Sequence, residues 1–225
     1  MSSDHEPAEP RPVASPFYPD LGVHVGELPT AFREQFLTPA DVRYDIVLEG
    51  EMDSIWHRPG WLWPLLWVSA WFDMLFPDTG RGTPATMVIS GGSYPGGRPY
   101  QTWRRTFRFA KARRFNAIML YDDRSQQVME LLGPANALQL AWGLRFAPPL
   151  TIEIWTGSAA LRLWRWRLPL PQWLSGTVRV VETADPDRDD TIHVDLTISH
   201  PLLGRIFGYE GTFRLRRQPL ASPAK

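Results

Sequence analysis

The side chains that could carry acid–base chemistry are scattered over the second half of the chain. General acid–base catalysis needs such groups within hydrogen-bond reach of one substrate. No pair among them has a spacing that forces two groups together, and His200 before Pro201 is typical of a turn. The sequence therefore offers candidates but no catalytic pair. The candidates are Glu130, Glu153, Glu182, His193, Asp195, His200 and Glu210.

Two stretches combine Arg with aromatic residues: WRRTFRFAKARRF at 103–115 and LRLWRWRL at 161–168. Such alternation is typical of a strand with one solvated and one packed face. It also suits contact between Arg and an anionic lipid headgroup or a ligand carboxylate. Nucleic acid could be bound by Arg on phosphates and rings on bases. However, Lys plus Arg and Asp plus Glu both number 24, so the chain lacks the usual excess positive charge, and we predict no nucleic-acid partner.

The sequence gives little support for a metal or a cofactor. There is no Cys, and the five His, at positions 5, 24, 57, 193 and 200, show no metal-ligand spacing. The glycine-rich GGSYPGG at 91–97 is typical of a turn, and no dinucleotide-binding or P-loop pattern is present. We predict no metal site and no cofactor.

The N-terminal MSSDHEPAEPRPVASP is acidic and proline-rich, without the basic and apolar regions of a signal peptide. We expect residues 1–16 to form a disordered tail, residues 17–218 a single β-rich domain, and residues 219–225 a disordered C-terminal tail. A cytoplasmic location follows as the default expectation.

Most of the chain shows the period-two pattern of strands. Residues 191–198, TIHVDLTI, place apolar side chains at every second position, and residues 99–109 alternate in the same way. About ten short runs separated by turn signals predict an antiparallel meander, mainly β with minor α, closed or curled into a barrel or half-barrel. A short helix at 29–37 and a strand at 42–52 precede it. The other predicted strands are 85–90, 115–121, 126–132, 138–145, 150–156, 160–167, 177–183 and 207–216.

The run WLWPLLWVSAWFDMLFP at 61–77 is the most apolar of the chain. At about 17 residues and roughly 25 Å it is short for a membrane span, which needs about 20 residues. Pro64 in its first turn and Pro77 at its end predict a helix, with Ser69 and Asp73 on one face. Three positions stay open: a core helix packed across the sheet, a cover over the mouth of an apolar cavity, or a helix resting on a membrane surface.

An ordered set of short motifs resembles a bacterial family called domain of unknown function 4166. Two departures stand out: Gln101 replaces an expected Glu before Trp103, and the helix after the first strand is unusually rich in Trp. Family members occur alone and appended to NAD(P)-binding reductase-like domains, which implies an accessory or substrate-binding role. Glu182 falls where the family tends to carry a glutamate. The motifs are PFYPDLG (16–22), LPTAFREQF (28–36), WRRTF (103–107), ELLGP (130–134), PLPQWL (169–174) and HPLLGRIFGYEGTF (200–213).

These observations favour a binding module over an enzyme, with a hydrophobic small molecule such as a lipid or isoprenoid held inside a curved β-structure. Arg105 would anchor a polar headgroup. One alternative is an enzyme, or an accessory domain of an NAD(P)-dependent reductase, in which Glu182, Arg105 and His200 converge. Another is a protein-interaction module serving a reductase partner; peripheral membrane contact is also open. The predicted ligand-binding residues are Trp67, Trp71, Trp103, Arg105, Phe107, Glu182, His200 and Tyr209.

Overall fold

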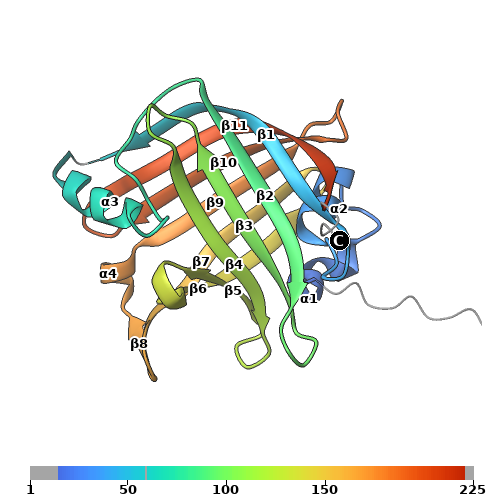
Figure 1. Ribbon diagram of the computed structural model, residues 1–225, viewed down its shortest axis with the longest axis horizontal. Coiled ribbons are helices and arrows are strands. Elements are labelled where there is room, and N and C mark those ends of the chain that lie inside the picture. The colour runs from blue at the N-terminus through green and yellow to red at the C-terminus, as the bar shows by residue number, and fades with distance from the viewer. Residues whose placement is uncertain (1–14, 59, 221–225) are drawn as a thin grey trace, which may run out of the picture.

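A computed structural model describes residues 15–58 and 60–220, which form a closed antiparallel β-barrel (Figure 1). Within these residues ten strands make the barrel and one extra strand, β8, lies beside β7. This confirms the predicted meander and its closure. The strands are β1 (Tyr44–His57), β2 (Thr83–Ser93), β3 (Pro99–Phe107), β4 (Arg113–Asp122), β5 (Gln127–Leu132), β6 (Leu138–Ala147), β7 (Thr151–Leu163), β8 (Trp166–Leu170), β9 (Thr177–Ala184), β10 (Thr191–His200) and β11 (Gly204–Pro219).

The strand order explains how the barrel closes. The sheet runs β6-β5-β4-β3-β2-β1-β11-β10-β9-β7-β8, and β6 also pairs with β7. The two strands predicted at 150–156 and 160–167 are largely one long strand, β7, which changes its partner. Thr151–Trp155 pair with β9, whereas Ala159–Leu163 pair with β8. The wall therefore parts between β7 and β9 at one end of the barrel.

Period-two alternation produces the core. In β10 the apolar residues Ile192, Val194, Leu196 and Ile198 are buried, as predicted, because successive side chains of a strand point to opposite faces. The inward positions of the other strands join them in one continuous apolar cluster.

The N-terminal segment packs against one end of the barrel (Figure 1). It contains α1 (Tyr18–Leu21), η1 (Gly22–His24) and α2 (Thr30–Phe36), the last close to the predicted helix at 29–37. Phe17 and Phe36 are fully buried and contact the ring of Trp103. We call this aromatic-rich segment the N-terminal plug.

The predicted tails lie mostly outside the described residues. Within them, Ser15 is buried and its hydroxyl donates a hydrogen bond of 2.5 Å to the carbonyl of Phe36. At the other end, β11 continues to Pro219, and the N–H of Leu220 donates to the carbonyl of Arg43.

The tryptophan-rich run forms a shorter helix than predicted. A 3₁₀ turn, η2 (Gly60–Leu62), leads into α3 (Trp63–Ala70), and Asp73 beyond it has a left-handed φ of 53°. Asp73 therefore does not share a helical face with Ser69, contrary to the prediction. Its carboxylate and carbonyl instead accept hydrogen bonds of 3.0 Å and 2.9 Å from the side chain and backbone N–H of Asn116. This local bonding replaces the helix.

The position of α3 is also settled. It lies at the end of the barrel opposite the plug, beside α4 (Gln172–Ser175) and the β7–β8 hairpin (Figure 1). It thus packs across one end of the barrel, with Leu62 and Leu66 buried. No helix among the described residues is long and apolar enough to cross a membrane. The remaining short helix is η3 (Pro134–Asn136).

Candidate functional site

The barrel encloses a cavity of about 580 Å³. Its walls are mainly apolar side chains on the inward positions of the strands, including Met87 and Leu196. A few polar groups interrupt this lining. We call the four buried ones Arg105, Glu130, Glu182 and Tyr209 the polar cluster.

Arg105 belongs to the lining because β3 alternates. Trp103, Arg105 and Phe107 are buried on the inner face, whereas Arg104 is exposed on the outer face. The guanidinium of Arg105 lies 4.7 Å from the ring centroid of Phe115 and 5.2 Å from that of Trp103. Such contacts with the faces of aromatic rings stabilise a cation where little water reaches it.

The charge of Arg105 is only partly satisfied within the protein. Its Nη1 lies 3.8 Å from Oε1 of Glu130, which is an ion pair but too long for a hydrogen bond. Nη1 is buried and has no hydrogen-bond partner among the described residues. A buried donor in this state costs stability until an acceptor reaches it. Arg105 is therefore suited to receive an oxygen atom of a ligand.

Glu130 faces Arg105 from β5. Burial raises the pKa of its carboxyl, while Arg105 and the indole N–H of Trp142 oppose this shift. That N–H donates to Oε2 of Glu130 over 3.2 Å. The protonated form of Glu130 is thus favoured by its surroundings more than it would be in water.

Glu182 extends the cluster toward the N-terminal plug. Its Oε2 accepts a hydrogen bond of 2.8 Å from the side-chain amide of Gln35 on α2. Burial raises the pKa of Glu182 to about 7, and the bond from Gln35 and the charge of Arg105 oppose the shift. Burial likewise raises the pKa of Tyr209 to about 12, so its hydroxyl stays protonated at neutral pH.

The raised pKa of Glu182 predicts a loss of stability with rising pH. In the folded state the carboxyl of Glu182 has a pKa of about 7, whereas in the unfolded chain its pKa is 4.5. As the pH rises, the unfolded chain therefore loses this proton at a lower pH than the folded state. The contribution of this carboxyl to the free energy of unfolding is complete below pH 4.5 and is lost as the pH rises through 7. The free energy of unfolding falls by about 3 kcal/mol, because each unit of pKa difference corresponds to about 1.36 kcal/mol. We expect Glu182→Gln to remove most of this loss, measured by urea unfolding at pH 5 and pH 8.

Glu153→Gln is the matched control for that experiment. Glu153 neighbours Ile152, the register partner of Glu182, but its carboxylate pairs with Arg145 and Arg179 on the outer face. These partners lower the pKa of Glu153, so its titration acts in the opposite direction. Glu153→Gln should not reduce the loss of stability between pH 5 and pH 8. An equal pH dependence in wild type and Glu182→Gln would contradict the prediction.

The mouth of the cavity lies at the end of the barrel that carries α3. Exposed residues line it there: Trp61 on η2, Leu65 on α3, Leu174 on α4, and Leu203 after β10. Gly157 and Ser158, where β7 leaves β9, complete the opening. The plug and the mouth thus occupy opposite ends of the cavity.

Six of the eight predicted ligand-binding residues line this one cavity. Trp67 and Trp71 do not. They lie on the outer side of α3, where their ring centroids are 4.8 Å apart. The inward side of this segment is occupied by Leu62 and Leu66, which are buried. The six are Trp103, Arg105, Phe107, Glu182, His200 and Tyr209.

His200 is far from the other polar groups along the barrel axis. Glu182 pairs with Val194, and His200 lies six residues farther along β10. At about 3.3 Å for each residue of a strand, this separates the two by roughly 20 Å. His200 is therefore at the mouth, and the arrangement in which Glu182, Arg105 and His200 act on one substrate atom is not formed.

The predicted ligand-binding set omitted Glu130, Trp142 and Gln35. Glu130 carried a usable signal: it is the single charged residue in the apolar strand QVMELL, on the same side as Val128 and Leu132. Trp142 and Gln35 carried none, because their roles depend on neighbours that are distant in the sequence.

The contacts of Gln101 explain why a Gln stands here in place of the Glu expected from the family resemblance. Its amide donates to the carbonyls of Phe36 and Thr38 over 3.1 Å and 3.3 Å, and its oxygen accepts from the indole N–H of Trp103. A carboxylate could not donate to those carbonyls. Gln101 therefore fastens the plug, and the acidic partner of Arg105 is Glu130.

Comparison with known proteins shows the family of this chain. The profile of Domain of unknown function (DUF4166) matches residues 28–213. The chain belongs to this family. The DUF4166 match includes all four residues of the polar cluster. A relative from Bacillus subtilis (strain 168), the uncharacterized protein YndH, is 28% identical over 151 residues, covering 67% of this chain and 73% of YndH. No solved structure matches the chain.

Proposed function

We propose that the barrel binds a hydrophobic small molecule, lipid-like or isoprenoid-like, with its apolar body in the cavity and an oxygen-bearing end at Arg105. The observation that carries this proposal is the unpartnered, buried Nη1 of Arg105 inside an otherwise apolar cavity of about 580 Å³. Small-molecule sites have volumes of about 300–1,000 Å³ and combine an apolar lining with a few placed polar groups.

The energetics are consistent with an extended apolar ligand. Each buried methylene contributes about 0.8 kcal/mol. A chain of about ten methylenes therefore contributes about 8 kcal/mol, which offsets a large part of the cost of association. The oxygen atom of the ligand satisfies Arg105 and fixes the orientation of the chain.

Direct titration tests the proposal. Delipidated protein is titrated with dansyl-labelled undecanoic acid, its methyl ester and geranylgeraniol, with dansyl fluorescence for the first two and a thermal shift for all three. We expect saturable binding of at least one probe. Preference for the acid over the ester identifies an anionic end group, and equal binding identifies a neutral acceptor. Absence of binding by all three probes would overturn the proposal.

Filling the cavity gives a second test. Ala159 is buried, lines the cavity and lies on β7 near its mouth. We expect Ala159→Trp to fold, because the indole can enter the cavity, and to weaken probe binding at least tenfold by occupying ligand space. Intrinsic and dansyl fluorescence measure the two effects. Ala141→Trp is the control for added bulk, because Ala141 packs in a separate apolar cluster outside the cavity. Unchanged probe affinity in folded Ala159→Trp would contradict the assignment.

The same geometry supports a binding role more than a catalytic one. His200 at the mouth and Glu182 beside the plug are too far apart to share a proton with one substrate. We retain the prediction of a cytoplasmic protein. That the domain interacts with a reductase partner stays a prediction, which co-purification from the native host would test.

A further inference from the structure

The exposed apolar side chains gather at the mouth end of the barrel. They come from four separate segments: η2 with α3, the β7–β8 hairpin, α4, and the turn between β10 and β11. We call this set the tryptophan rim. Its members are Trp61, Trp63, Leu65, Trp67, Val68, Trp71, Phe72, Leu163, Trp164, Trp166, Leu168, Trp173, Leu174, Leu202 and Leu203.

Within the rim, α3 presents its largest side chains outward. Leu62 and Leu66 are buried against the barrel, while Trp63 and Trp67 stack outside with ring centroids 6.3 Å apart. In the hairpin, Trp164 is 89% exposed and has a left-handed φ of 54°. A set of exposed aromatic residues of this size marks an interaction surface, because it stabilises nothing inside the barrel.

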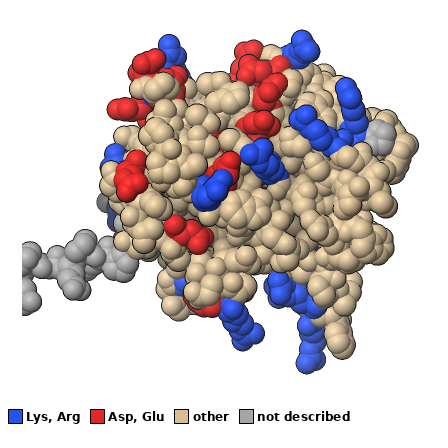
Figure 2. Space-filling model, turned by 180° about the vertical axis from the view of Figure 1, so that it is seen from behind, with Lys and Arg blue, Asp and Glu red and all other residues tan. Residues whose placement is uncertain are grey.

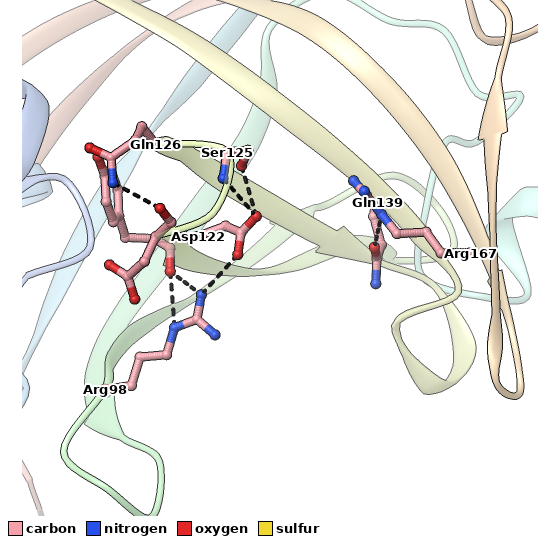
Figure 3. Close-up of polar contacts among 8 residues, drawn as sticks. Arg98, Asp122, Ser125, Gln126, Gln139 and Arg167 are labelled. Atoms are coloured by element: carbon pink, nitrogen blue, oxygen red, sulfur yellow. Dashed lines mark hydrogen bonds and ion pairs between the residues drawn. The ribbon is translucent and has the colours of Figure 1, made fainter.

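The hairpin is braced against the barrel. The side chain of Arg167 on β8 donates a hydrogen bond of 3.1 Å to the side-chain oxygen of Gln139 on β6 (Figure 3). This contact holds the hairpin two residues from its tip at Trp164 and Arg165, and the tip projects beyond the wall (Figure 1). The rim is thus presented by a supported element.

The charges at the mouth end are nearly all positive. The connections among the described residues at this end hold two carboxylates, Asp73 bonded by Asn116 and Asp78 paired with Arg113 at 2.5 Å, and the carboxylate of Glu51 on β1 reaches Gly82. In Figure 2 the charged side chains displayed toward the right-hand end are basic. The basic residues at this end are Arg58, Arg81, Arg108, Lys111, Arg113, Arg114, Arg162, Arg165, Arg167 and Arg205.

The plug end carries charges of both signs. In Figure 2 acidic side chains lie toward the top and the left, with basic side chains among them. Of these basic residues, Arg98 donates to the carbonyl of Tyr121 and pairs with Asp122 (Figure 3), and Arg217 pairs with Glu34. The mouth end is therefore more basic than the plug end. The acidic residues at this end are Asp20, Glu27, Glu34, Asp41, Asp122, Asp123, Asp185, Asp187, Asp189 and Asp190.

We propose that the tryptophan rim docks the protein on an anionic lipid bilayer. Trp residues favour the boundary between headgroups and acyl chains, and Arg adds attraction to anionic headgroups. The charge argues against a second copy as the occupant, because two mouth ends placed together would oppose like charges. The contact is peripheral, with the rim at headgroup depth.

Docking would also set the direction in which the cavity opens, a consequence that rests on the proposed function. Trp61, Leu65, Leu174 and Leu203 belong both to the rim and to the mouth. With the rim in the bilayer, the mouth faces acyl chains. A hydrophobic ligand then passes between membrane and cavity without crossing water.

Vesicle co-sedimentation tests the docking. The full chain is mixed at low salt with vesicles of phosphatidylglycerol or of phosphatidylcholine. We expect binding to the first, at least tenfold weaker binding to the second, and weakening as salt screens the charges. A blue shift of Trp fluorescence should accompany binding. Absence of binding to phosphatidylglycerol vesicles would overturn the proposal.

Variants locate the surface. Two pairs of changes alter exposed residues that do not line the cavity and leave the Arg167 contact in place: Arg162→Glu/Arg165→Glu and Trp164→Ser/Trp166→Ser. We expect each pair to weaken vesicle binding at least tenfold, since one basic residue near the surface contributes about fivefold. The matched controls are Arg124→Glu at the plug end and Trp155→Ser on the barrel wall, both exposed, which should bind as wild type. Equal loss in the controls would contradict docking through the rim.

Two further results distinguish bilayer docking from ligand binding and from dimerisation. Rim variants that lose vesicle binding but retain the dansyl probe in solution would support docking independently of the ligand site. A wild-type protein that binds vesicles but no probe would overturn the proposed function alone. Sedimentation equilibrium that reveals a dimer abolished by the rim changes, with no vesicle binding, would assign the rim to a second copy and overturn the docking.

Discussion

Arg105→Met is expected to weaken binding of the dansyl-labelled acid by about 10- to 100-fold, because a hydrogen bond to a charged group contributes about 1.5–3 kcal/mol. Methionine keeps much of the length and apolar volume of the Arg side chain, so the change removes chiefly the donors. Titration of the delipidated variant by dansyl fluorescence measures the effect.

The adjacent residue supplies the control. Arg104 lies on the same strand but points outward, where it contacts Ser90 and pairs with Asp45. Arg104→Met should therefore leave probe affinity within about twofold of wild type, as expected for a surface change away from the site.

Loss of Arg105 leaves Glu130 without its buried partner, which could destabilise the fold. The double variant Arg105→Met/Glu130→Gln removes both charges and keeps an acceptor for the indole N–H of Trp142. If this double variant folds and binds the acid as tightly as wild type, Arg105 does not hold the end group of the ligand.

Phe36→Ala is expected to have the largest effect on stability, lowering the free energy of unfolding by about 3–5 kcal/mol. Phe36 is fully buried in the N-terminal plug, and its ring centroid lies 5.1 Å from Phe17 and 5.7 Å from Trp103. Truncation leaves a space among these rings that they cannot close. Urea unfolding followed by Trp fluorescence measures the change.

Phe72→Ala is the matched control, because Phe72 is 45% exposed in the tryptophan rim. It should cost less than about 1 kcal/mol. Similar costs for the two changes would mean that the plug is not part of the cooperative core.

The raised pKa values of the polar cluster connect stability with the proposed binding role. Burial disfavours the ionised forms of Glu130 and Glu182 although Arg105 is near both. The protein thus keeps a cation inside an apolar cavity without fully neutralising it. For the proposed function, this imbalance predicts a preference for ligands with an acceptor group.

Much of the wall of the barrel could be predicted from the sequence. Alternation in a strand is a property of the backbone, so Trp103, Arg105 and Phe107 had to share one face whatever their partners. The same rule placed Ile192 and Val194 inward together. Turn signals separated most strands correctly. The exceptions were β7, where the chain changes partner without a turn, and the turn at Trp164 and Arg165, which lies inside the strand predicted at 160–167.

The tryptophan-rich run shows where local patterns are insufficient. Its apolar composition predicted one helix over 61–77, but the backbone leaves the helix after Ala70 and turns at Asp73. The hydrogen bonds to Asn116 on β4 favour this turn, and a residue 43 positions away cannot be read from a local pattern.

The sequence by itself determined most of the strands, their inward faces and the shared face of Trp103, Arg105 and Phe107. Only the tertiary structure decided that Glu130, Glu182 and Tyr209 surround that Arg and that His200 does not. It also decided that most of the exposed Trp side chains, together with a group of basic residues, lie at one end of the barrel. The reason is physical: alternation is fixed by each strand alone, whereas neighbours across a closed barrel are fixed by register and closure, which depend on the whole chain at once.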